Sequence, residues 1–387
     1  MAPTASSESI AFRNLSISPT RIDLEAVTSE GSFPLWFKFN RAVGVSPHAL
    51  AIALSTLCGT KYEQVHFDFP VDDELLSSIS SFTKASVTSN GHESYNRPPC
   101  DNVTLSFSGG FDSLAALRLL GDRAELVSTD FGGWFEREAE FFEKFNPLVV
   151  STNIRRTPTQ QDSFARNHWT FMGIGAILTA DHLHSGFHVF GTILGDRFSR
   201  RPSRTSVAPL EMAGLRNIPM TDGITELGTA KILAQTDPEL ISESISSLAG
   251  KTDRKRLLKL VLATVAANEL GVDVTLPDIP TDWDKPIDFN SSYTTALSTL
   301  YLIAKGKEHL IAPLYNGIPD SAFAITEGLT LDFVMKVNSD FYESLPKEIA
   351  MEVAPKFLEL GFSPYTETDW VEAKLVRSYL NRIFGKK

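Results

Sequence analysis

The sequence is poor in cysteine. Only Cys58 and Cys100 occur among its 387 residues, and they do not form a Cys-x-x-Cys pair. Two isolated thiols exclude a zinc site built from cysteines, so we expect no zinc. They also argue against enzymes that relay sulfur through paired thiols. Such low cysteine usage is typical of proteins in a reducing compartment.

The sequence also lacks a long apolar run and a secretory leader. Its richest apolar segment, Leu257 to Ala267, is shorter than a membrane span and is interrupted by Lys259. Residues 1–8 contain neither the basic nor the apolar region of a signal peptide. We therefore expect a cytoplasmic protein that has no membrane partner.

Positive charge is in deficit. The chain has 36 Lys and Arg against 47 Asp and Glu, which gives a net charge of −11 and an isoelectric point of about 5.3. Proteins that hold RNA or DNA along the backbone usually need a basic face, so this composition argues against a nucleic-acid partner. A hydrophobic fraction of 42% and a charged fraction of 21% are those of a soluble globular protein, and the length suggests two or three domains.

The chain has no internal repeat or low-complexity tract, and its hydrophobic pattern divides it into three parts. Residues 1–100 mix strand-like and helical segments, which predicts an N-terminal α+β domain of open role that ends in a turn-rich linker at 88–101. Residues 101–236 alternate short apolar strands with helical segments, which predicts a parallel sheet with crossover helices. Residues 237–387 lose the strand signal and predict a helical C-terminal region.

The predicted elements follow from these periodicities. Strands are expected at 21–27, 34–40, 62–69, 103–107, 124–129, 147–151 and 187–191. Helices are expected at 47–58, 72–81, 113–120, 134–145, 162–184, from 237 onward with Asp237 as its cap, and at 254–270, 292–304, 329–337, 347–360 and 369–384. In a parallel sheet, ligands collect beyond the carboxyl ends of the strands. The residues that follow each strand are therefore the candidates for function.

The most informative segment follows the predicted strand at 103–107 and reads Ser108-Gly109-Gly110-Phe111-Asp112-Ser113. A strand, a glycine turn and a helix start form a nest of backbone N–H groups at a positive helix end, which binds phosphate oxygens. The two glycines let the backbone close on an anion without an intervening Cβ. Ser108 and Ser113 add hydroxyl donors, and Asp112 is a candidate Mg²⁺ ligand. The alternative is an ordinary strand–helix turn.

This motif resembles the PP-loop of the ATP pyrophosphatase superfamily, which includes the GMP, NAD, argininosuccinate and asparagine synthetases. It is not the Walker A pattern, which would end in Gly-Lys-Ser/Thr. The resemblance implies a Rossmann-like, HUP-type parallel sheet with helices on both faces. It also implies that ATP and Mg²⁺ are bound at residues 108–113.

Residues 102–235 further resemble the 7-cyano-7-deazaguanine synthase branch of that superfamily. The likeness rests on Asp130-Phe131-Gly132 after the second strand, Arg166-Asn167 before a helix, and Gly191 to Asp196 after the fourth strand. Ile193 replaces the asparagine of that last motif. Members of the branch carry four zinc-binding cysteines that this chain lacks, and they have no counterpart of residues 1–100. These departures indicate a relative with a changed acceptor.

The resemblance implies roles for particular residues. The nucleotide would be bound by 108–113 together with Asp130 and Phe131, and the substrate by Arg166, Asn167, Asp196 and Arg197. Catalytic roles would fall to Asp112, Asp196, Lys231 and Arg166, with Asp112 and Asp196 holding Mg²⁺.

Several of these residues have structural alternatives. Asp130 is equally well explained as a helix cap. Arg197, Arg200, Arg201 and Arg204 either clamp an anion or lie in a solvated loop, and Lys231 is either a phosphate ligand or a surface residue. The histidines at 168, 182, 184 and 188 are better explained as core or surface residues than as metal ligands.

We therefore expect an ATP-dependent ligase. A carboxylate or amide oxygen of the substrate, for which a deazapurine is a candidate, would be adenylated with release of pyrophosphate. A nitrogen nucleophile, either ammonia or a protein amine, would then release AMP. The alternatives are a nucleotide-binding regulatory or defence-system protein without turnover, and a PP-loop sulfur transferase. A homodimer is compatible with the sequence.

Overall fold

The computed structural model describes residues 8–133, 136–156, 163–201, 206–248, 253–279 and 286–386. Its chain forms two compact units. The first, here called the sheet unit, comprises the described residues of Met1–Ser108, Asp122–Val189 and Thr205–Ile218. The second, the helical unit, comprises those of Gly109–Gly121, Phe190–Arg204 and Pro219–Lys387. The two units group the chain differently from the three domains expected at 1–100, 101–236 and 237–387.

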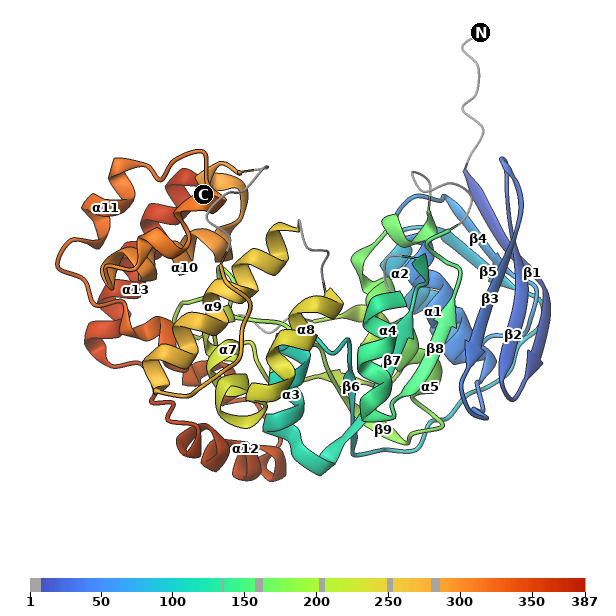
Figure 1. Ribbon diagram of the computed structural model, residues 1–387. Coiled ribbons are helices and arrows are strands. Elements are labelled where there is room, and N and C mark those ends of the chain that lie inside the picture. Colours follow the sequence, from blue (N-terminus) through green and yellow to red (C-terminus); the bar gives the residue numbers. More distant parts are fainter. Residues whose placement is uncertain are drawn as a thin grey trace, which may run out of the picture. The chain divides into compact units, whose positions relative to one another are not determined.

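All ten described strands belong to one mixed sheet in the sheet unit, in the order β10-β9-β6-β7-β8-β3-β2-β1-β4-β5 (Figure 1). Six of the nine described pairings between neighbours are parallel. The strands are β1 Ser9–Ser18, β2 Arg21–Thr28, β3 Gly31–Phe39, β4 Gln64–Phe67, β5 Ser86–Ser89, β6 Asn102–Ser106, β7 Ala124–Asp130, β8 Leu148–Thr152, β9 Ser185–Val189 and β10 Arg216–Asn217. The α/β class is thereby confirmed, and each predicted strand overlaps an observed one.

The N-terminal strands extend the same sheet as the Rossmann-like strands. β1, β2 and β3 form an antiparallel meander, and β3 pairs antiparallel with β8 through Phe37–Thr152 to Phe39–Val150. Alternate residues of β2 and β3 are buried, including Ile22, Leu24 and Phe37. Because β3 covers the edge of β8, residues 1–100 and the parallel strands share one core.

The parallel strands contain a point at which the strand order reverses. The chain runs outward from β6 to β7 and β8, and then returns to place β9 on the other side of β6. Because the chain crosses outward through α4 and back through α5, crossovers of the usual right hand place these helices on opposite faces of the sheet. Ligands of doubly wound folds bind beyond the carboxyl ends of the strands at such a point. The glycine-rich segment begins there, directly after β6.

The helices of the sheet unit are α1 Pro47–Cys58, α2 Asp73–Thr83, α4 Glu136–Phe142, α5 Ile174–Thr179 and α6 Ala208–Met212. The helix predicted at 162–184 is wrong over much of its length, and residue 162 lies outside the described residues. Two 3₁₀ helices, Phe164–Arg166 and Trp169–Gly173, precede the short α5. The interruption arises because His168 adopts an extended backbone and its ring accepts a hydrogen bond from the Thr170 N–H.

The helical unit holds α3 Phe111–Leu120, α7 Glu226–Thr236, α8 Ile241–Leu248, α9 Arg254–Leu270, α10 Tyr293–Ala304, α11 Asp320–Thr326, α12 Lys347–Glu359 and α13 Glu367–Ile383. The predictions at 254–270, 292–304, 347–360 and 369–384 are confirmed. The one at 329–337 is wrong, because Leu331 is left-handed and only Asp332–Met335 forms a 3₁₀ turn. Asp237 does not cap the helix after it, since its carboxylate accepts from Arg118 of α3 instead. None of the described helices is long and apolar enough to span a membrane.

A buried histidine in β9 makes the stability of the fold depend on pH. The ring of His188 lies 2.8 Å from Ser106 Oγ and 3.2 Å from Asn217 Oδ1, and burial lowers its pKa to about 4. Because the unfolded chain takes up this proton near pH 6.5, stability should fall by about 3 kcal/mol as the pH drops from about 6.5 to 4. We expect His188→Gln to flatten this slope in denaturant unfolding measured across the same range. An unchanged slope would assign the pH dependence to other groups.

Candidate functional site

The glycine-rich segment forms the turn between β6 and α3. Gly109 has a left-handed backbone with φ of 74°, and Gly110 occupies the cap position of α3, where no side chain caps the helix. The Gly109 carbonyl accepts a hydrogen bond from Ser244 Oγ of α8 at 2.8 Å. Since the two ends of a peptide group point in opposite directions, this bond directs the Gly110 N–H away from α8. The turn thus joins a left-handed glycine to the positive end of α3, and we call residues 109–113 the glycine turn.

The side chain of Asp112 lies within a polar cluster of three helices. Its Oδ1 accepts from Thr229 Oγ1 of α7 at 2.9 Å and from Lys259 Nζ of α9 at 3.2 Å. Lys259 Nζ also lies 3.6 Å from Glu226 Oε1 at the start of α7. We call Asp112, Glu226, Thr229 and Lys259 the carboxylate–lysine cluster. It lies at the first turn of α3, within and beside the glycine turn.

Burial sets the electrostatics of this cluster. The side chain of Lys259 is only 3% exposed, and that of Glu226 is 14% exposed. Burial lowers the pKa of Lys259, but Asp112 and Glu226 outweigh it and raise that pKa above its ordinary value. Burial raises the pKa of Glu226, and Lys259 opposes that rise. A buried, charged lysine therefore compensates two partly buried carboxyl groups, of which Asp112 is 27% exposed.

The cluster has the donor set that a hard divalent cation prefers. Asp112 and Glu226 supply carboxylate oxygens and Thr229 supplies a hydroxyl, which suits Mg²⁺. Glu226 Oε2 is buried and has no hydrogen-bond partner among the described residues, so it is an acceptor without a donor. Lys259 now occupies the position between the two carboxylates. No group of three His, Cys, Asp or Glu residues with metal-binding geometry occurs in the described part of the chain.

Gly191, just beyond β9, allows a close approach to α3. A Cβ at this position would lie 2.7 Å from the Ser113 nitrogen and 3.0 Å from the Asp112 carbonyl carbon. These are backbone atoms in the first turn of α3, so they cannot move aside as a side chain would. Glycine is required here for the segment after β9 to lie against the start of α3.

We expect Gly191→Ala to displace the start of α3 and to lower the free energy of unfolding by about 1–3 kcal/mol, as overpacking does. Denaturant titration of the full chain measures this loss. Gly44→Ala is the matched control, because a Cβ at Gly44 has no neighbour within 4 Å. Equal stabilities of the two variants would contradict the close approach.

The segment after β9 contains a second polar group, centred on Asp222. Its side chain, 6% exposed, accepts from Thr192 Oγ1 at 2.8 Å and is paired with Arg197. The Arg197 guanidinium also lies 5.3 Å from the centroid of the Phe341 ring. Arg197 is thus tied to a buried acid, and the predicted substrate role of Arg197 gains no support from these contacts.

Asp196, predicted to share Mg²⁺ with Asp112, is not among the carboxylate–lysine cluster. Its carboxylate is 44% exposed and is paired with Lys386 near the C-terminal end. This pairing lowers the pKa of Asp196. Glu226 takes the place beside Asp112 that the sequence assigned to Asp196.

Lys231 of α7 contacts the turn after α12. Its Nζ donates to the Gly361 carbonyl at 2.6 Å and lies 4.2 Å from the centroid of the Phe362 ring, and burial lowers its pKa. It therefore joins α7 to the turn after α12. The cation beside Asp112 is Lys259, for which the sequence analysis had no role.

The remaining candidates belong to the sheet unit. Asp130 Oδ1 accepts from the Gly132 N–H at 2.7 Å, so it stabilises the turn after β7. Phe131 is buried against Phe171, and the Arg155 guanidinium lies 5.8 Å from the Phe131 ring. With one face packed in this way, Phe131 is part of the core of that unit. Its predicted contact with a nucleotide stays a prediction.

Arg166 and Asn167 follow one another in the sheet unit but differ in surroundings. Asn167 Nδ2 donates to the Leu57 carbonyl at 2.7 Å, which fastens this segment to α1. Arg166 is exposed at the end of a 3₁₀ turn.

The other arginines that follow Asp196 differ in their surroundings. Arg200 is paired with Glu367, Arg201 is exposed, and Arg204 lies outside the described residues.

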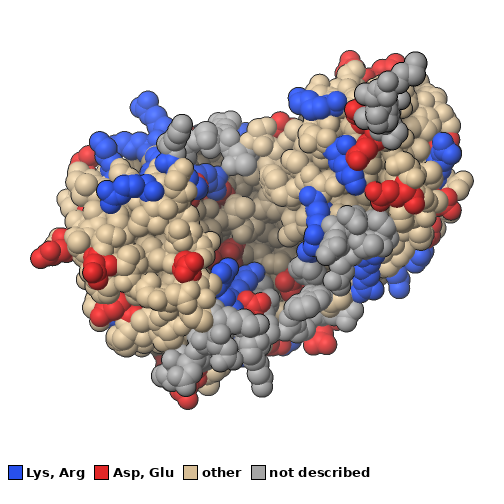
Figure 2. Space-filling model, turned by 90° about the horizontal axis from the view of Figure 1, so that it is seen from above, with Lys and Arg blue, Asp and Glu red and all other residues tan. Residues whose placement is uncertain are grey.

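Charge is distributed without a strong bias on the face of the molecule in Figure 2, where acidic and basic side chains are interspersed over the described residues. No family model, no curated protein and no solved structure matches this chain. The candidate site is therefore supported by the contacts described above and not by a relative.

Proposed function

We propose that this chain is an ATP-dependent ligase of the PP-loop, HUP-type class, which adenylates a substrate oxygen and releases pyrophosphate. One observation carries the proposal: the glycine turn at the start of α3 adjoins the carboxylate–lysine cluster. A nest of N–H groups binds phosphate oxygens, and a neighbouring lysine with two carboxylates suits a metal-bound polyphosphate.

The tasks of the chain's own residues follow from phosphoryl-transfer chemistry. The turn at 109–113 would hold the β- and γ-phosphates as the substrate oxygen attacks the α-phosphate, and it would retain the leaving pyrophosphate through N–H donors. Lys259 would contribute positive charge to this leaving group. Asp112 and Glu226 would hold Mg²⁺, which when bound neutralises charge on the phosphates. AMP would leave when a nitrogen nucleophile attacks the adenylated substrate.

A role in sulfur transfer is disfavoured by the thiols. Cys58 is buried in α1, and burial raises its pKa, so its thiol stays protonated. Cys100 alone remains partly accessible. A relay through two thiols therefore has no second nucleophile among these cysteines.

The test combines binding with product analysis. We expect the full chain to bind ATP with Mg²⁺ in calorimetry and, with ammonia and a set of heterocyclic carboxylic acids, to form AMP and pyrophosphate. Formation of ADP and phosphate would contradict the proposal. Nucleotide binding without turnover, even with substrates extracted from the producing cell, would favour a regulatory protein instead.

A further inference from the structure

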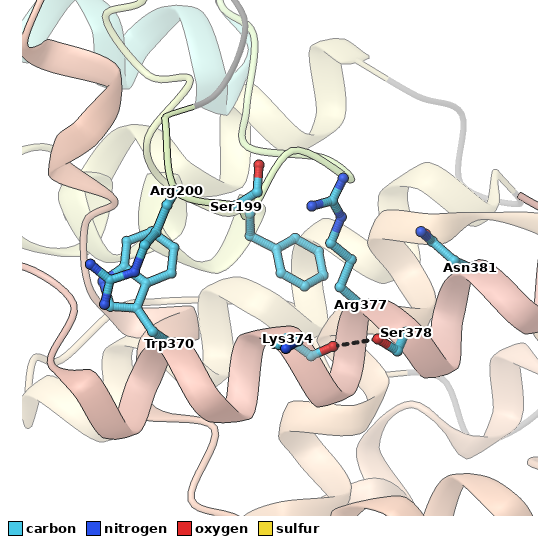
Figure 3. A pocket seen from close by; sticks show the side chains of 8 residues that line it. Ser199, Arg200, Trp370, Lys374, Arg377, Ser378 and Asn381 are labelled. Carbon is cyan, nitrogen blue, oxygen red and sulfur yellow. Dashed lines mark hydrogen bonds between the residues drawn. The ribbon is translucent and has the colours of Figure 1, made fainter. Parts of the chain in front are cut away.

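The helical unit contains a polar cavity of about 420 Å³ between α13 and the segment that follows Asp196 and Arg197 (Figure 3). One wall is a stripe of α13 that includes Trp370, Lys374, Arg377 and Asn381, spaced so that they share one face of the helix. The opposite wall includes Ser199 and Arg200. None of the eight residues that line the cavity is acidic.

Two of its cations are uncompensated. Lys374 is exposed, and its ammonium has no ion pair or hydrogen bond among the described residues. Arg377 Nε is buried and has no hydrogen-bond partner in the described part of the chain. A buried guanidinium nitrogen without an acceptor is costly, so an acceptor supplied by a ligand would be favourable. In Figure 3, Arg377 rises from α13 toward the wall that carries Ser199.

Two acids that adjoin lining residues of the cavity are already paired. Arg200 donates to both carboxylate oxygens of Glu367 at 2.7 Å, and its guanidinium lies 5.0 Å from the centroid of the Trp370 ring. Asp196 is paired with Lys386. Lys374 and Arg377 therefore give the cavity two positive charges in a chain whose net charge is −11.

Neutral donors complete the lining. Asn381 Oδ1 accepts from the Tyr293 hydroxyl at 3.2 Å, which leaves the amide nitrogen of Asn381 as the donor. The stacked pair of Trp370 and Arg200 closes one end of the cavity, and Asn381 lies at the other (Figure 3). Two cations with an amide donor match a dianion with several acceptor oxygens.

We propose that this cavity binds a small phosphate monoester dianion, with Arg377 and Lys374 as its principal ligands. A phosphate monoester carries a charge of about −1.5 to −2 near neutral pH, which matches the two open cations. The site is separate from the glycine turn at 109–113 and does not depend on the function proposed for that turn.

The experiment is a calorimetric titration of the full chain with inorganic phosphate at constant ionic strength, and in parallel with succinate. We expect phosphate to bind, and Lys374→Gln/Arg377→Gln to bind it at least about tenfold more weakly. The affinity of Arg377→Lys for phosphate should lie between those of the wild type and the double variant. Lysine keeps the positive charge but lacks the paired N–H donors of the guanidinium. Arg382→Gln is the matched control, since Arg382 lies on α13 over Tyr379 and does not line the cavity.

Three results would overturn the proposal. Undiminished phosphate binding by the double variant would place phosphate elsewhere, for instance at the glycine turn. Binding of succinate in preference to phosphate would replace the monoester with a dicarboxylate. Failure of the folded wild-type protein to bind either anion would leave the cavity without this role. Asp112→Asn should not alter binding here, so loss of the proposed ligase activity leaves this test intact.

Discussion

Replacing Asp112 with asparagine should lower the release of pyrophosphate and AMP at least about a hundredfold, the scale of losing one electrostatic contact to a reacting group. The amide keeps the size of the side chain and an oxygen for Thr229, but it removes the charge that faces Lys259 and that would hold Mg²⁺. Pyrophosphate release is measured with the substrate and amine donor identified by product analysis.

Asp122→Asn serves as its control, because Asp122 is an exposed carboxylate just beyond the other end of α3. It should leave the rate unchanged. Turnover of ATP at the wild-type rate by folded Asp112→Asn would remove Asp112 from the active site, and the assignment of the whole cluster would then be wrong.

Lys259→Met should lower the free energy of unfolding by about 3–5 kcal/mol at neutral pH, because it leaves two partly buried carboxyl groups without their cation. The sign of its pH dependence follows from Glu226, whose pKa is raised by burial. A carboxyl group with a raised pKa contributes stability below its unfolded value, and this contribution is lost as the pH rises through the folded value. Without Lys259 that pKa rises further, so the loss extends toward neutral pH.

Denaturant unfolding at about pH 5 and about pH 8 tests this effect, and the deficit of the variant should be larger at the higher pH. Lys255→Met is the matched control, since Lys255 is exposed in the first turn of the same helix and its loss should change stability by less than about 0.5 kcal/mol. A deficit that shrinks as the pH rises would mean that Lys259 does not compensate the two acids.

Several predictions that depend only on residues close together in the sequence agree with the structure. The turn at 108–113 requires only a strand, two glycines and a helix start, and all of these are neighbours in sequence. Helix α9 was likewise predicted at its observed bounds, 254–270, from its apolar periodicity. The helix predicted at 329–337 does not form, because Leu331 adopts a left-handed backbone. The pattern of apolar residues does not predict such a conformation.

Contacts between residues far apart in the chain could not be predicted from the sequence pattern. In the sequence, Lys259 was interpreted only as an interruption of an apolar run. In the structure its ammonium donates a hydrogen bond to Asp112, which lies 147 residues earlier in the chain. The signal that could have revealed it is a lone lysine in a buried helix, because a buried charge needs a partner. Lys231, chosen instead, donates to the Gly361 carbonyl. Neither helical pattern specifies which of the two cations faces α3.

By itself, the sequence determined the α/β class, most of the helices and strands, and the conformation of the glycine turn, because these depend on residues close together along the chain. Only the tertiary structure decided that β3 pairs with β8, that Glu226 rather than Asp196 stands beside Asp112, and that Lys259 joins them. The physical reason is that pairing of charges and strand edges depends on distances in space, which hydrophobic periodicity does not encode.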